Sequence, residues 1–197
     1  MKQISALIIF ALMIGSATLS HGGTLKGKID VSGKVNPENV VVYVEGIKGD
    51  FKAPSKRPQM NHVNLQFKPL ILPILKGTTV DFPNSDPVFH SGFSISAANP
   101  FDLGLYGQGM EKFVHFGNSG TDELFCHIHS HMHAYVLSLD NPYFASVNKD
   151  GSYTITDIPE GSYNVTAWLN PNNISKKSAK IPDGDQSAEL NFTIAEK

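Results

Sequence analysis

The sequence predicts an all-β protein. Short runs rich in Val, Ile, Phe and Tyr alternate with clusters of Gly, Pro, Asn and Asp, which is the pattern of strands separated by turns. No stretch shows the sustained 3.6-residue period of an amphipathic helix. Many short strands at this spacing are typical of a β-sandwich or barrel rather than a parallel sheet covered by helices.

Each expected strand is an apolar or alternating run that stops at a turn-forming cluster. The expected strands are Leu25–Val31, Val40–Val44, Leu65–Phe67, Ile71–Ile74, Thr78–Pro83, Gly92–Ile95, Lys112–His115, Asp122–Cys126, Ala134–Leu139, Ser152–Ile155, Tyr163–Leu169 and Ala188–Ile194.

Two compositional styles interleave along the chain. The segments "GTLKGKIDVSGKVNPENVVVYVEG" and "DGSYTITDIPEGSYNVTAWLN" are plain hairpins, whereas the stretch between them is rich in Phe, His, Pro and Asn. We expect residues 24–53 and 145–197 to complete one small sandwich, with a second sandwich over residues 54–144 inserted into it. The alternative is a single continuous sandwich that carries an additional C-terminal set of hairpins.

Residues 1–20 have the layout of a secretory signal peptide. Lys2 precedes an apolar run from Ile4 to Ile14, and small residues follow. The run is too short to span a bilayer, and cleavage after Ser20 is expected. We therefore expect a periplasmic or secreted protein without stable membrane insertion after cleavage; an uncleaved N-terminal anchor is the alternative.

The net charge and the cysteine content limit which classes of function the protein can have. The formal net charge is −2, so no strong basic field favours nucleic acid as a partner. Cys126 is the single cysteine of the chain, although exported domains usually use cysteines in disulfide pairs. Such a thiol is inert and buried, reactive, or held as a thiolate by a metal, and composition does not choose among these.

The stretch "CHIHSHMH" at residues 126–133 permits two mutually exclusive arrangements. A tight loop would bring Cys126, His129 and Met132 onto one side, whereas a strand would place Cys126 and His129 on opposite faces. In a strand, the four histidines would instead share one face. These histidines are His127, His129, His131 and His133.

The converging loop would supply a thiolate, an imidazole and a thioether. A second imidazole is available at His90, in the segment "NSDPVFHSGFSIS" that follows a predicted turn. Two histidines and one cysteine with a distant axial methionine are the donors of a blue-copper electron-transfer site.

Three segments carry a family resemblance: "FKPLILPILKGTTVDFPNSDPVFHSGFSIS", "FDLGLYGQG" and "LFCHIHSHMHAYVLSLDNPYFA". Residues 59–169 resemble the cupredoxin family, most of all the cupredoxin-like proteins of methylamine utilisation and their plastocyanin-like relatives. The short Cys-x-x-His-x-x-Met loop is similar to that of amicyanin. The resemblance implies a Greek-key cupredoxin sandwich with one type 1 copper per chain, bound by His90, Cys126, His129 and Met132.

The resemblance extends to the second half of the chain and has one departure. "DGSYTITDIPEGSYNVTAW" is similar to carboxypeptidase-regulatory, prealbumin-like β-sandwiches, which accompany such domains. In many cupredoxins an asparagine follows the first histidine and ties the two ligand loops together. Here Ser91 and Gly92 follow His90. Serine donates and accepts but reaches less far, so this tie is in doubt.

We expect other histidines and aromatic residues to contribute to the sandwiches rather than to the metal site. His62 and His115 are expected on the sandwich surface, and Trp168 and Tyr163 in the core of the small sandwich. The alternating residues Phe101, Leu103 and Leu105 are expected to point inward. For the remaining histidines of the ligand loop, two interpretations stay open: solvated side chains, or groups at the copper edge that titrate near pH 6.5. They are His127, His131 and His133.

The function expected from these features is one-electron transfer by an exported type 1 copper protein, through transient contacts with redox partner proteins. Copper storage, delivery or sensing without electron transfer is the alternative, and an interaction module built on the same fold is a third. Catalysis is not expected. Phe125 replaces the flanking histidine of a multicopper oxidase, and neither a dinuclear copper site nor a Cys-rich zinc site is possible with one cysteine.

Overall fold

The computed structural model describes residues 22–33, 35–184 and 186–195. The expected signal peptide at residues 1–20 lies outside these residues. Within them, the regular structure consists of seventeen β-strands and one short 3-10 helix, Pro37–Asn39, which confirms the all-β prediction. No helix in the described part of the chain has the length and apolar character needed to cross a membrane.

One group of strands comes from the two ends of the described chain. Strand β1 (Gly23–Ser32) pairs with β13 (Ser152–Ile158), β16 (Ser187–Glu189) and β17 (Phe192–Ala195). The facing sheet has the order β12 (Phe144–Ser146), β2 (Val41–Val44), β14 (Gly161–Asn170) and β15 (Asn173–Ile181). A core of buried residues such as Leu25, Val42, Ile158 and Val165 fills the space between the two sheets.

The second group comes from the middle of the chain. Its main sheet has the order β5 (Ile71–Leu75), β11 (His133–Leu139), β10 (Gly120–Phe125), β7 (Phe93–Ser94) and β8 (Phe101–Asp102). Two antiparallel strand pairs complete this group. They are β6 (Thr78–Pro83) with β9 (Glu111–Phe116), and β3 (Asn61–His62) with β4 (Phe67–Lys68).

Strand β6 shows how the sequence produces this packing. Its buried positions are Thr78, Val80 and Phe82, and its intervening residues are only half-buried. This two-residue period directs Val80 and Phe82 into the core of the second group, where they meet Leu124 and Val136 of the main sheet.

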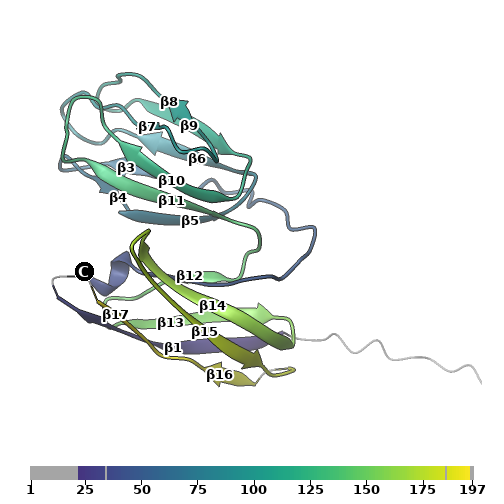
Figure 1. Ribbon diagram of the computed structural model, residues 1–197. Helices are drawn as coiled ribbons and strands as arrows, with labels where there is room; N and C mark the ends of the chain where they lie inside the picture. The colour runs from purple at the N-terminus through teal and green to yellow at the C-terminus, as the bar shows by residue number, and fades with distance from the viewer. Residues whose placement is uncertain (1–21, 34, 185, 196–197) are drawn as a thin grey trace, which may run out of the picture.

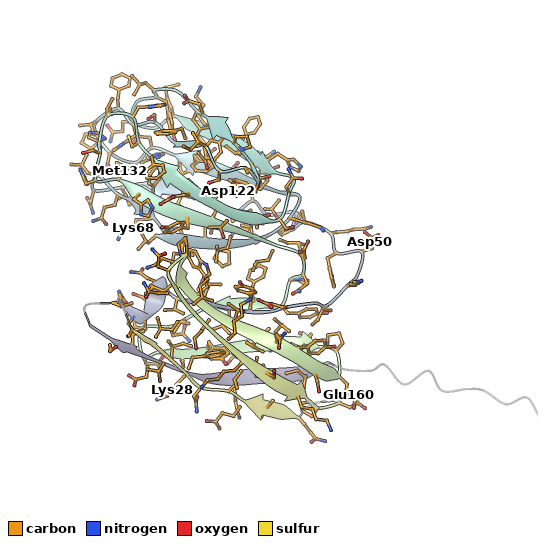
Figure 2. All side chains as sticks on the ribbon, viewed as in Figure 1. Lys28, Asp50, Lys68, Asp122, Met132 and Glu160 are labelled. Carbon is orange, nitrogen blue, oxygen red and sulfur yellow. The ribbon has the colours of Figure 1, made fainter. Side chains whose placement is uncertain are left out.

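The two groups meet through an apolar junction. Val41 and Trp168 from β2 and β14 pack with Ile71, Tyr135 and Leu137 from β5 and β11. The rings of Tyr135 and Trp168 meet edge to face with centroids 5.1 Å apart. Figure 1 shows the two groups stacked, with β5 and β11 facing β12 and β14, and Figure 2 shows side chains filling the space between them. The division into two domains at residues 54 and 144 remains a prediction.

Most expected strands are present, and the differences have identifiable causes. Leu65, expected in a strand, lies in the β3–β4 turn with a positive φ of 56°. The last expected strand is divided into β16 and β17, which both pair with β1. Strand β15 was not expected, because its sequence "NISKKSAKI" is rich in lysine; it lies at the edge of its sheet, where charged side chains are tolerated.

Three side chains differ from expectation. Leu105 is 58% exposed, so it does not continue the inward face of Phe101 and Leu103, which pack against the core. Trp168 is buried as expected, but in the junction between the two groups. His62 was expected on the surface and is fully buried.

Candidate metal centre

The "CHIHSHMH" stretch forms a loop rather than a strand. Strand β10 ends at Phe125 and β11 begins at His133, and these two residues pair across the sheet. Between them, the Met132 amide donates a hydrogen bond to the His129 carbonyl at 2.9 Å, which closes a turn. The structure therefore excludes the strand arrangement of the two that the sequence allowed.

His90 reaches the same place from a separate segment between β6 and β7. Its backbone exchanges two hydrogen bonds with Tyr106, with N···O distances of 3.0 and 2.9 Å. The side chain of His90 has no solvent exposure. An isolated β-bridge thus fixes the backbone from which this imidazole projects into the protein.

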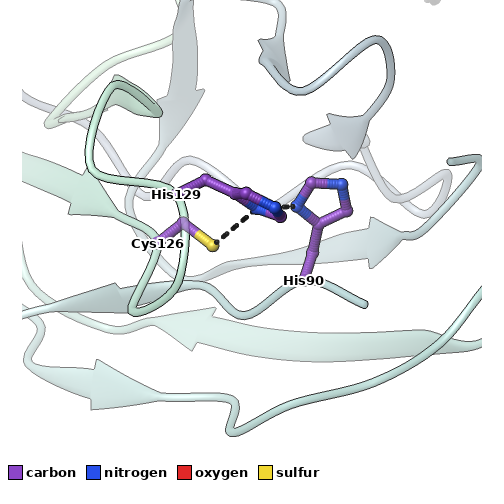
Figure 3. Close-up of side chains that lie close together, drawn as sticks. All are labelled: His90, Cys126 and His129. Carbon is purple, nitrogen blue, oxygen red and sulfur yellow. Dashed lines mark hydrogen bonds between the residues drawn. The ribbon is translucent and has the colours of Figure 1, made fainter. Parts of the chain in front are cut away.

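Three donor atoms meet between the two segments, as Figure 3 shows. The Nδ1 atoms of His90 and His129 are 3.1 Å apart. The Sγ atom of Cys126 lies 3.7 Å from Nδ1 of His129. The ligand atoms of all three residues lie within 4.8 Å of one another. Among the described residues this is the one group of three or more His, Cys, Asp or Glu side chains that satisfies this criterion.

Two of the three separations can be compared with the ligand spacing of a single metal ion. With metal–nitrogen and metal–thiolate bonds of about 2.0 and 2.3 Å, a nitrogen–metal–sulfur angle of about 120° separates nitrogen and sulfur by about 3.7 Å. A nitrogen–metal–nitrogen angle of about 100° separates two nitrogens by about 3.1 Å. The measured distances of 3.7 and 3.1 Å match both values. Both pairs, Cys126–His129 and His90–His129, therefore have the separation of two ligands of one ion.

Met132 is buried beside this group. It lies in the same apolar cluster as Cys126, with 1% of its surface exposed. Its position at the end of the ligand loop is labelled in Figure 2. Ligation by its thioether remains a prediction.

A buried carboxylate holds the far side of the His90 ring. Oδ2 of Asp86 lies 2.8 Å from Nε2 of His90. The backbone amides of Leu65 and Asn64 donate to the same carboxylate. Burial raises the pKa of Asp86, but the hydrogen bonds from Leu65, Asn64 and His90 outweigh it, so its pKa lies below the ordinary value. An ionised Asp86 accepts a hydrogen bond from the Nε2–H group of His90 and leaves Nδ1 of His90 free to bind a metal.

Ser91 makes the tie between the loops that the sequence left in doubt. Its Oγ accepts a hydrogen bond from the His127 amide at 2.9 Å. The same hydroxyl donates to Sγ of Cys126 at 3.7 Å. Ser91 is fully buried and directly follows His90, so a short side chain is sufficient where the two loops lie this close together.

His129 differs from the other donors in its exposure. It is half-buried, whereas His90, Cys126 and Met132 are buried. Burial lowers the pKa of His129, and the neighbouring His90 and His131 lower it further. The neutral imidazole, which is the form that binds metals, is therefore favoured at neutral pH.

The three flanking histidines each have a specific partner. Nε2 of His127 lies 3.0 Å from Asp102, and its ring stacks on Phe93 with centroids 4.1 Å apart. Nε2 of His131 donates to the Leu65 carbonyl at 3.1 Å. His133 is 2.7 Å from Glu123. None of the three belongs to the donor group, and their influence on its chemistry remains a prediction.

Sequence reasoning missed two residues at this site. Asp86 stands four positions before His90 in "DPVFH", and the general pairing of metal-bound histidines with carboxylates would have indicated it. His62 lies far from the ligands in the chain, and no pattern in the sequence indicates that its ring stacks on that of His90 with centroids 5.0 Å apart. Burial lowers the pKa of His62 to about 4, so this ring is neutral.

No protein-family model matches the chain, and no curated protein matches it. Among solved structures, it is similar to a purple cupredoxin from Nitrosopumilus maritimus, with 23% identity over 42% of this chain and 99% of that one, and a TM-score of 0.38. A copper-containing nitrite reductase from Thermus scotoductus is 20% identical over 57% of this chain and 28% of its own, with a TM-score of 0.42.

A reduced mutant of amicyanin is 12% identical over 50% of this chain and 98% of its own, with a TM-score of 0.41. Because these TM-scores are below 0.5, the similarities do not assign a function, and the function is argued from the side chains of the site.

Proposed function

We propose that this protein is an exported cupredoxin that carries one electron on a single type 1 copper ion. The observation that carries the proposal is the meeting of one thiol and two imidazoles from two separate segments, with their ligand atoms within 4.8 Å of one another. The proposed ligands are His90, Cys126, His129 and Met132. Bound there, copper supplies the Cu(II)/Cu(I) couple.

The chemistry of the donors supports copper over harder metals. A thiolate and a thioether are soft donors that stabilise Cu(I), and imidazoles suit both oxidation states. Burial of His90, Cys126 and Met132 excludes water from the proposed ligand set. The β-bridge at His90 and the paired ends of β10 and β11 restrict movement of the ligands. Little rearrangement is then needed when the charge of the ion changes.

The half-buried edge of His129 is the proposed route by which the electron leaves. Exposed apolar side chains directly precede both imidazole ligands in the chain: Phe89 is 61% exposed and Ile128 is 50% exposed. An apolar surface of this kind suits a small, short-lived interface with a redox partner protein. We place this encounter in the periplasm or outside the cell, where the expected signal peptide would direct the protein.

A storage or delivery function predicts more than one tightly bound copper ion. The single donor group among the described residues favours one ion per chain. The flanking histidines are already paired with Asp102, Glu123 and the Leu65 carbonyl, which makes them poor additional ligands. Copper stoichiometry therefore separates the two functions.

The test is a titration of the purified, full exported chain with Cu(II), followed by visible absorption and by the copper content after dialysis. We expect one copper per chain and an intense thiolate-to-copper band that disappears in Cys126→Ser. His131→Gln, a change in the same loop outside the proposed ligand set, is the matched control and should retain the band. Absence of the band in the wild-type protein contradicts the proposal, and two or more tightly bound ions favour storage.

A further inference from the structure

His62 lies against the first proposed ligand without belonging to the donor group. It is fully buried at the end of β3, and its ring lies nearly parallel to that of His90, with an interplanar angle of 21° and centroids 5.0 Å apart. The ring of Phe67, on the paired strand β4, packs against the ring of His62 with centroids 4.8 Å apart. The planar ring of His62, itself packed against Phe67, therefore supports the ring of His90.

The hydrogen bonds of His62 fix the orientation of its ring. Nδ1 is 3.2 Å from the Pro83 carbonyl and 3.1 Å from the hydroxyl of Tyr106. Tyr106 is also the residue whose backbone pairs with His90. The ring plane of His62 is therefore held from two sides, by these hydrogen bonds and by the ring of Phe67.

The turn of the same hairpin holds the opposite edge of the site. Asn64 and Leu65 have positive φ angles of 55° and 56°, which direct their amides to Asp86 at 2.6 and 2.9 Å. Asp86 in turn binds Nε2 of His90, and the Leu65 carbonyl accepts from His131 of the ligand loop. The β3–β4 hairpin thus contacts the face of His90 through His62 and the ligand loop through Leu65, and it reaches the Nε2 edge of His90 through Asp86.

These two restraints on His90 are complementary. The hydrogen bond to Asp86 determines where Nε2 lies but allows the ring plane to swing about that contact. Stacking on His62 removes this freedom, because a tilted ring would collide with the flat face below it. Together they direct Nδ1 of His90 toward Cys126 and His129.

We propose that the β3–β4 hairpin is a clamp on the first ligand and that His62 is its positioning residue, which holds the plane of His90 constant in the metal-free, oxidised and reduced protein. This inference rests on the proposed function and specifies how its ligand geometry is maintained. A fixed imidazole plane lowers the rearrangement that accompanies each electron transfer.

The experiment compares three substitutions at His62 with a control. His62→Leu removes the planar ring, His62→Gln keeps a side-chain donor without a ring, and His62→Phe keeps the ring without the nitrogens. His115→Leu is the control, since His115 is exposed on β9 and bonds only to Thr79. Each variant is measured as the copper protein by electron self-exchange and as the metal-free protein by nitrogen NMR of the His90 ring.

We expect His62→Leu and His62→Gln to slow self-exchange by about tenfold while the thiolate band is kept. Their metal-free spectra should show a His90 ring that samples several orientations, whereas His62→Phe and His115→Leu should resemble the wild type. Wild-type behaviour of folded His62→Leu or His62→Gln overturns the clamp, as does a tenfold loss in His62→Phe. If the wild type forms no thiolate–copper band, the proposed function fails, and the metal-free spectra still decide whether His62 orders His90.

Discussion

Replacing Asp86 by Asn should raise the reduction potential of the copper-loaded protein. The change keeps the size of the side chain but removes a buried negative charge 2.8 Å from His90. That charge stabilises Cu(II) more than Cu(I), because the oxidised ion carries one more positive charge. Its loss therefore favours the reduced ion.

The magnitude follows from the geometry. Oδ2 of Asp86 is 2.8 Å from Nε2 of His90, and adding the width of the ring and a metal–nitrogen bond of about 2.0 Å places the charge about 7 Å from the ion. At an effective dielectric constant of about 20, unit charges at that distance interact by about 2.4 kcal/mol. For a one-electron couple this corresponds to about 100 mV.

The assay is a spectroelectrochemical titration of the thiolate band at constant pH and ionic strength. Asp140→Asn is the matched control, because Asp140 is an exposed carboxylate paired with Lys76 at 2.8 Å; screening by salt limits its effect to about 10 mV. A potential that is unchanged or lower in Asp86→Asn, with the band intact, would refute the reasoning that an ionised Asp86 supports His90.

Three further predictions concern stability and tuning of the site. Leu65→Gly creates an Asn64–Gly turn without left-handed strain, and should raise the free energy of unfolding by about 1 kcal/mol in a urea titration; a lower midpoint contradicts this. Ser91→Ala removes a donor to the Cys126 sulfur, so voltammetry should show a lower reduction potential, and an increase would count against that hydrogen bond. Burial lowers the folded-state pKa of His62 from 6.5 to about 4, so the unfolded chain binds this proton first as pH falls. Metal-free protein should therefore lose about 2 kcal/mol of stability between pH 7 and 4.5 through this group, and urea unfolding of His62→Phe should show a correspondingly smaller loss; an equal loss in both proteins argues against the assignment.

The strand pattern was largely predictable, because alternation of apolar and polar residues directly reflects which face of a strand is buried. Strand β6 was expected at Thr78–Pro83 and has those bounds. The β3–β4 turn was not predictable in the same way, because Leu65 adopts a backbone conformation that leucine rarely takes. Its amide is held there by Asp86, a residue from another segment.

The candidate donors were also predicted from the sequence. Cys126, His129 and Met132 lie within one short loop, and the search for a second imidazole led to His90. Their roles as ligands remain to be tested with copper. What no local pattern revealed is the support around them: His62 beneath the ring and Asp86 at its edge.

By itself, the sequence determined the β-rich architecture and the candidate donors of the loop, since both depend on residue types at short spacing. Only the tertiary structure decided that the "CHIHSHMH" stretch turns rather than extends, and that the imidazole of His90 meets the loop from a separate segment. It also decided that a histidine expected on the surface is buried against a candidate ligand. The physical reason is that local spacing limits which side chains can share a face, whereas contacts between distant segments depend on how whole sheets pack.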